Sequence, residues 1–282
     1  MSANQVCPIP IIERLERLLL STDGSQYCES AVIAAINLAK ACGSKLYAVS
    51  VVETNPELMA IAPGLVEKMG KETRQHLESV KERASKEGAD CEIIVHEGEE
   101  PYQYIVDEAA KNKVGMIVMG RRGRTGLTRL MMGNVTVKVI GYTLCRVLVV
   151  PKDAKLTFEK ILIATDGSMH SEFASNEAIS IAKRSGSTLI VLSVAKKDEN
   201  LTAAKENVDM VKKAAEKEGI KVEALIRKGV PHEVIVNTAA QEDVGLIVVG
   251  SHGRTGISKL LMGSVTERVI GHARCAVLVW KL

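Results

Sequence analysis

Short apolar runs alternate with longer amphipathic stretches along this chain, and each pattern predicts a different kind of element. Several of the short runs are almost continuously apolar, which is typical of strands covered on both faces in a parallel sheet. The runs that predict strands are, in chain order, Leu18–Thr22, Leu46–Val52, Cys91–Val95, Met116–Gly120, Val147–Val150, Ile161–Thr165, Thr188–Val194, Val222–Ile226, Leu246–Val249 and Ala276–Val279.

Helical patterns fill the intervals between these strands, as at Ser30–Ala41, Glu67–Glu87 and Tyr102–Lys111. Pro101 and Pro231 stand where a first helical turn would begin, a position at which the missing N–H of proline costs nothing. Strands that alternate with helices through right-handed crossovers form a doubly wound sheet. We therefore expect an α/β protein with helices on both faces of parallel sheets.

The sequence contains an internal repeat. The run LLLSTDGS at 18–25 matches ILIATDGS at 161–168, and GRRGRTG at 120–126 matches GSHGRTG at 250–256. Such self-similarity indicates two copies of one structural unit. The first copy carries a longer segment around Thr54–Met69, and a polar stretch at Pro151–Thr157 separates the copies. We predict two tandem domains, 1–153 and 154–282.

Composition narrows the classes of function. Hydrophobic residues make up 46% of the 282 residues and charged residues 25%, which is the balance of a globular protein. A net charge of +3 and an aromatic content of 3% do not favour a nucleic-acid partner. No apolar run reaches the roughly 18–20 residues that span a bilayer, and the first residues lack a signal-peptide pattern. We expect a cytoplasmic protein with no membrane partner.

The candidate chemistry lies in a glycine-rich turn after the fourth strand of each half. In the second half, Gly250 and Gly253 are followed, after nine intervening residues, by Gly263 and Ser264. Glycine has no Cβ, so backbone that ends in glycines can approach a ligand closely. Ser264 favours an N-cap, and the N–H groups of the first helical turn after it would attract phosphate oxygens.

Asp166 ends the first strand of the second half, and Asp23 has the same place in the first half. Where the first and fourth strands are neighbours, their carboxyl ends flank the switch point at which doubly wound sheets bind ligands. There, Asp166 can accept hydrogen bonds from ribose hydroxyls or help to hold a divalent cation. Each aspartate can also serve only to open its turn or to cap the next helix, and this alternative stays open.

The spacing G-x2-G-x9-G-[ST], with an aspartate ending the first strand, resembles the universal stress protein family over nearly the whole chain, twice. The resemblance implies a five-stranded parallel sheet in each half, Rossmann-like and of the adenine nucleotide alpha hydrolase-like type. In the ATP-binding branch of the family it implies ATP or AMP at the switch point. It also implies that the last strands, Val147–Val150 and Val277–Val279, pair into an intrachain pseudo-dimer, and a further homodimer stays open.

The resemblance also implies which residues bind the nucleotide. In the second half these are Asp166, Val194 through its backbone, Gly250, Gly253, Gly263, Ser264 and Val265; in the first half they are Asp23, Val51, Gly120, Gly123, Gly133, Asn134 and Val135.

The first half departs from the family pattern at Asn134, which stands where Ser or Thr is expected. Asparagine is an equally good N-cap and its amide can donate to phosphate, but it is bulkier and lacks the hydroxyl. We expect two sites built alike, with the second the more secure. Arg124 and Arg254 recur in the two turns, where each would either screen a phosphate or lie on the surface.

The motifs of efficient hydrolases are missing from the sequence. There is no G-x4-G-K-[ST] and no G-x-S-x-G, and the histidines show no metal-ligand spacing. We predict a stress-response regulator that binds an adenine nucleotide without efficient catalysis. Two alternatives stay open: a slow Mg²⁺-dependent ATPase or adenylate hydrolase that uses Asp23 or Asp166, and a scaffold without a ligand.

Overall fold

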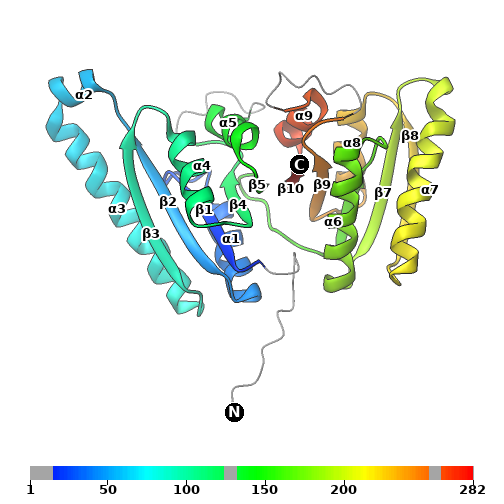
Figure 1. Ribbon diagram of the computed structural model, residues 1–282, viewed down its shortest axis with the longest axis horizontal. Coiled ribbons are helices and arrows are strands. Elements are labelled where there is room, and N and C mark those ends of the chain that lie inside the picture. The colour runs from blue at the N-terminus through cyan, green and yellow to red at the C-terminus, as the bar shows by residue number, and fades with distance from the viewer. Residues whose placement is uncertain (1–14, 124–131, 254–261, 282) are drawn as a thin grey trace, which may run out of the picture.

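The structure is a computed structural model that describes residues 15–123, 132–253 and 262–281. Strands and helices alternate through two similar halves (Figure 1). The first half contains β1 (Arg17–Ser21), α1 (Glu29–Cys42), β2 (Lys45–Glu53), α2 (Pro56–Ile61), α3 (Pro63–Lys86), β3 (Cys91–Gly98), α4 (Pro101–Lys111), β4 (Met116–Gly120), α5 (Asn134–Tyr142) and β5 (Arg146–Val150). The second contains β6 (Lys160–Ala164), α6 (Met169–Ser185), β7 (Thr188–Ala195), α7 (Leu201–Lys217), β8 (Val222–Lys228), α8 (Pro231–Gln241), β9 (Leu246–Gly250), α9 (Ser264–His272) and β10 (Ala276–Trp280). Arg124 and Arg254 lie outside the described residues.

The predicted strands are all present, with ends that differ by a few residues. The largest difference among the strands is at β3, which runs on to Gly98. Helix α3 begins at Pro63 rather than at Glu67, because proline is tolerated in a first helical turn. Its first turns and α2 form the longer segment of the first half, where the second half has a 3-10 turn at Asp198–Asn200.

All ten strands belong to one sheet, with the order β3-β2-β1-β4-β5-β10-β9-β6-β7-β8. Within each half the strands are parallel, which confirms the predicted fold class. The halves join where β5 and β10 pair antiparallel, with Leu278 opposite Leu148, as the pseudo-dimer requires. Each last strand covers the other's edge, which removes an exposed apolar edge from both halves.

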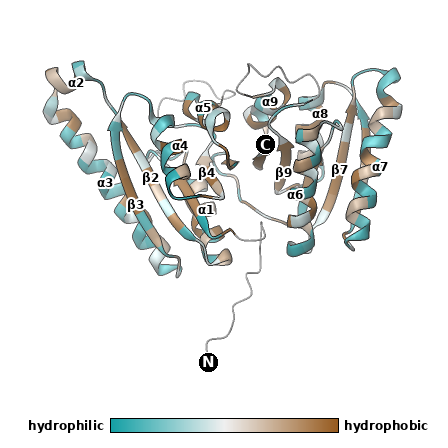
Figure 2. Cartoon of the chain, in the orientation of Figure 1, coloured by the Kyte–Doolittle hydropathy of each residue, from teal (hydrophilic) through white to brown (hydrophobic). Residues whose placement is uncertain are grey.

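The core has two layers, one on each face of the sheet. Leu18 and Leu20 of β1 face α1 and α3, whereas Leu19 faces the opposite layer with α4 and α5. The second half repeats this with α6 and α7 on one face and α8 and α9 on the other. Figure 2 accordingly shows mostly hydrophobic strands between helices that carry hydrophilic residues. Among the described helices, none is both long and apolar enough to cross a membrane.

Candidate functional site

The carboxyl ends of β1 and β4 lie side by side, and so do those of β6 and β9. In each half the helices that follow these two strands cover opposite faces of the sheet, α1 and α5 in the first half and α6 and α9 in the second. This is the geometry of a topological switch point. The Asp-Gly-Ser turn and the glycine-rich turn of each half therefore meet at the end of the sheet.

Asp166 lies directly against the glycine-rich turn. Its Oδ1 accepts a hydrogen bond from the Ser168 N–H at 3.0 Å, and a Cβ added to Gly253 would lie 2.6 Å from its Oδ2. In the first half, Asp23 accepts from the Ser25 N–H at 2.9 Å, and its Oδ2 is the atom nearest to a Cβ added at Gly123. The aspartate thus shapes its own turn with one oxygen and faces the opposite turn with the other, so the two roles considered for it are compatible.

Gly250 and Gly120 lie where another part of the chain packs closely against the strand end. A Cβ added to Gly250 would lie 2.7 Å from the carbonyl carbon of His170, in the first turn of α6. One added to Gly120 would lie 3.0 Å from Sγ of Cys28 and 3.1 Å from the carbonyl oxygen of Tyr27. These glycines let the segment after the Asp-Gly-Ser turn pack against the strand end. Close chain packing therefore accounts for these two glycines in addition to the ligand approach predicted from the sequence, and their contact with a ligand stays a prediction.

The predicted N-cap at Ser264 is wrong. The N-cap of α9 is Gly263, with φ −68° and ψ 140°, and Ser264 is the first helical residue. The Gly263 N–H donates to the Ser251 carbonyl at 2.9 Å, which closes the turn and holds Gly263 in the extended conformation of an N-cap. In the same way Gly133, not Asn134, is the N-cap of α5. Because no described side chain caps either helix, the N–H groups of both first turns can receive an anion.

Val194 does not end its strand, since β7 continues to Ala195. The register of β6 with β7 stops at Ala164–Leu192, and the Thr165 N–H donates to the Leu192 carbonyl at 2.9 Å. Val194 therefore lies two residues beyond the part of β7 that pairs with β6, on the strand next to Asp166, and it still pairs with Arg227 of β8. Val51 has the corresponding place in β2, two residues after Val49, whose carbonyl accepts from the Thr22 N–H. Val135 and Val265 are half-buried in the first turns of α5 and α9.

Comparison with known proteins assigns both halves of the chain to one family. The Universal stress protein family matches residues 15–151 and 157–281. The chain belongs to this family. A universal stress protein of Methanocaldococcus jannaschii is 36% identical over 144 residues, which cover 50% of this chain and 84% of that protein. The predicted boundary after residue 153 falls between the two matched segments and stays a prediction.

A solved structure shows the same fold over nearly the whole chain. A universal stress protein from Archaeoglobus fulgidus has a TM-score of 0.80 and 22% identity, and the likeness covers 96% of this chain and 98% of that one. Another solved universal stress protein from that organism, in complex with dAMP, is 26% identical, with a TM-score of 0.38 over 45% of this chain and 99% of its own.

The second site of this universal stress protein holds a pair of histidines. The ring centroids of His170, in the first turn of α6, and His252, in the glycine-rich turn, lie 5.2 Å apart. Burial lowers the pKa of His170, the nearby His252 lowers it further, and Asp166 opposes both effects. The first half has Tyr27 and Arg122 at the corresponding positions of the repeat. His252 stands in the repeated glycine-rich turn and His170 follows the Asp-Gly-Ser turn, 82 positions earlier in the chain (252 − 170). Only the meeting of the two strand ends brings them together, so the sequence alone did not pair them.

Acidification is expected to destabilise the protein through His170 at the second site. The folded-state pKa of His170 lies below its ordinary value of 6.5, so the unfolded chain binds the proton more readily. The stability that His170 contributes is therefore present above that value and is lost as pH falls. His170→Tyr, which copies the first half, should flatten the fall in urea midpoint between about pH 7.5 and about pH 5.5. An identical slope in the variant would assign the effect to other groups.

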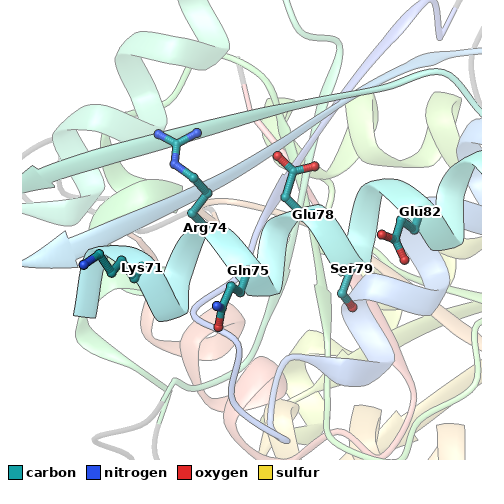
Figure 3. A pocket seen from close by; sticks show the side chains of 6 residues that line it. All are labelled: Lys71, Arg74, Gln75, Glu78, Ser79 and Glu82. Atoms are coloured by element: carbon teal, nitrogen blue, oxygen red, sulfur yellow. The ribbon is translucent and has the colours of Figure 1, made fainter. Parts of the chain in front are cut away.

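A surface hollow on α3 lacks the convergence of groups from several elements that a ligand site needs. Lys71, Arg74, Gln75, Glu78, Ser79 and Glu82 line a shallow hollow on α3 (Figure 3). All six come from one helix, and this pattern is typical of a solvated helix face. Within the described part of the chain, no three His, Cys, Asp or Glu side chains are grouped so that they could hold a metal ion.

Proposed function

We propose that this universal stress protein binds an adenine nucleotide at the switch point of each half and acts as a regulator without efficient turnover. The observation that carries the proposal is the contact of an aspartate oxygen with a glycine of the opposite turn, Asp166 with Gly253 and Asp23 with Gly123. A carboxylate there can accept from ribose hydroxyls, and the bare backbone beside it leaves room for an anion.

Each part of the nucleotide has a matching group at the second site. Asp166 would accept hydrogen bonds from the ribose, and the backbone of Val194, on the neighbouring strand, would meet the adenine edge. The N–H groups at the start of α9, after Gly263, would receive phosphate oxygens with the support of the helix dipole. The first site offers the same set through Asp23, Val51 and α5. Ser264 and Asn134, both exposed first residues of their helices, would distinguish the two sites.

The nucleotide would bring its own Mg²⁺ where one is needed. Because the described residues contain no grouping of three metal ligands, the phosphates would supply most of the ligands, which is how proteins usually hold this ion. The sequence also contains neither of the two hydrolase motifs, G-x4-G-K-[ST] and G-x-S-x-G. This favours binding and regulation over rapid hydrolysis.

Nucleotide binding is expected to raise the stability of the protein. A ligand selective for the folded state adds about 2.7 kcal/mol when its concentration is about 100 times its Kd. The melting temperature should therefore rise with ATP, ADP or AMP at millimolar concentration, and mass spectrometry of the denatured purified protein should identify the bound species. No change with any of the three nucleotides would favour the scaffold without a ligand.

The enzyme alternative makes a different prediction for the conservative variant Asp166→Asn. The amide oxygen can still accept from the Ser168 N–H, so the turn is expected to survive. Mg²⁺-dependent product release well above background that this substitution abolishes would favour a slow ATPase or adenylate hydrolase. Tight binding without turnover in the wild-type protein would favour the regulator.

A further inference from the structure

Arg121 joins the first site to the helix of the second. Its Nη1 donates to the carbonyls of Gly271 at 3.0 Å and Ala273 at 2.9 Å, with a longer contact to Ile270 at 3.4 Å. These carbonyls lie at the carboxyl end of α9, in the other half of the chain. A cation at this end of a helix is favourable, because the last carbonyls lack intrahelical partners and carry the negative end of the dipole.

The same residue belongs to the glycine-rich turn of the first site. The Arg121 carbonyl accepts from the Gly133 N–H at 2.9 Å, and its own N–H donates to the Val150 carbonyl at 3.3 Å. Gly133 is the N-cap of α5, so Arg121 holds the start of the helix that would receive phosphate in the first site. Its side chain, meanwhile, holds the end of α9.

The other end of α9 forms the second site. The helix has 9 residues, so it is only about 13 Å long. Its Thr266 hydroxyl donates to the Gly250 carbonyl at 2.8 Å, which fixes the first turn to the tip of β9. A short helix fixed at both ends moves as one body, so Arg121 and the second site act on the same element.

Lys281 makes the reciprocal connection with a different side chain. Its Nζ donates to the Gly141 carbonyl at 2.6 Å, at the carboxyl end of α5. The preceding residue, Trp280, accepts through its carbonyl from the Ser251 N–H at 2.9 Å, within the turn of the second site. In the repeat, Arg121 corresponds to Ser251 and Lys281 to Pro151. The two connections are therefore not copies of one inherited contact.

We infer that the two nucleotide sites are coupled, so that occupancy of one tightens the other through Arg121 and α9 and through Lys281 and α5. This inference rests on the proposed nucleotide binding. A ligand held at Gly253, Gly263 and the start of α9 fixes the position of α9, and through its last carbonyls the position of Arg121, whose own carbonyl holds the start of α5. The second ligand then binds to a site whose helix is already held in place, which produces positive cooperativity. Coupling between sites in proteins is commonly about 5-fold to about 150-fold in affinity.

The test compares both sites together with each site alone. ATP is titrated calorimetrically into the wild-type protein, into Gly123→Val, which blocks the first site, and into Gly253→Val, which blocks the second. The coupling factor is the overall constant for filling both sites divided by the product of the two single-site constants. We expect about 5 or more in the wild-type protein. Asp23→Ala and Asp166→Ala provide a second pair of single-site variants if a valine variant fails to fold.

The same measurement in an Arg121→Met/Lys281→Met background tests the pathway. We expect the coupling factor to fall to about 1, the value for independent sites, while melting curves verify that the variant is folded. Arg121→Lys keeps the charge at the end of α9 and should restore part of the coupling.

Two results would overturn the inference: a wild-type coupling factor of about 1, or full coupling in the double methionine variant. Absence of ATP binding in the wild-type protein would instead refute the proposed function, and the inference would fall with it.

Discussion

Valine at position 253 is expected to abolish nucleotide binding at the second site while the first site continues to bind. A Cβ at this position would lie 2.6 Å from Oδ2 of Asp166, closer than real Cβ contacts come, and valine adds two methyl groups beyond it. The aspartate must then leave the turn, or the turn must move away from β6. The carboxylate oxygen that would accept from the ribose is then lost to the ligand, and a hydrogen bond to a charged group is worth about 1.5–3 kcal/mol. This corresponds to about 10-fold to about 150-fold in Kd, and the two methyl groups would also fill space that the ligand needs.

Calorimetric titration with ATP checks this prediction through the number of sites. Gly253→Val should lose one of the two binding events, and Gly123→Val should lose the other. Gly64→Val is the matched control, because it introduces the same side chain at a glycine of α3 with nothing within 4 Å. If Gly253→Val keeps both binding events with unchanged affinity, the corner between Asp166 and Gly253 is not the nucleotide site.

The corner itself could be predicted from the sequence because the information is local and occurs twice. An aspartate that ends one strand and glycines that end another fix two strand tips, and the strand order of a doubly wound sheet brings those tips together. Asp166 and Gly253 are 87 positions apart in the chain (253 − 166), yet the fold rule alone places them side by side, and the structure has them in contact.

The role of each small residue within the corner depends on contacts that no local pattern encodes. Serine is a residue type that favours N-caps, but the hydrogen bond from the Gly263 N–H to the Ser251 carbonyl makes Gly263, and not Ser264, the N-cap of α9. Gly250 would allow a ligand to approach the backbone closely, but the backbone of His170 already occupies the space beside its Cα. In both cases tertiary packing decided between two roles that the residue type allows equally well.

The contacts between the two halves could not be predicted at all from periodicity. Arg121 reaches a carbonyl that is 150 positions away in the sequence, and Lys281 reaches one that is 140 positions away. Neither side chain has a counterpart in the repeat, so comparing the chain with itself gives no signal. Such contacts arise only once β5 and β10 have paired, and that pairing determines which surfaces of the two halves meet.

A buried ion pair connects the two halves of the chain near the β5–β10 pairing, and its loss is expected to have a large effect on stability. Nη2 of Arg146, in β5, lies 3.1 Å from Oε2 of Glu177, in α6, and the side chains are 20% and 7% exposed. The guanidinium also stacks 4.2 Å above the ring of Trp280. Burial raises the pKa of Glu177, while Arg146 lowers it. Arg146 therefore favours the charged form of a carboxyl group that burial disfavours.

Arg146→Ala is expected to destabilise the protein by about 3 kcal/mol near neutral pH, because removing one partner of a buried pair leaves the other charge without compensation. Without Arg146 the folded-state pKa of Glu177 rises further above its ordinary value of 4.5, so the folded state binds a proton more tightly than the unfolded chain. Stability then falls as pH rises above that value. Urea unfolding should therefore show a larger loss of stability at about pH 8 than at about pH 5.

Adding Glu177→Gln to the variant removes the buried charge and should remove this dependence on pH. An equal loss at both pH values would mean that lost packing against Trp280, rather than the stranded carboxylate, accounts for the effect.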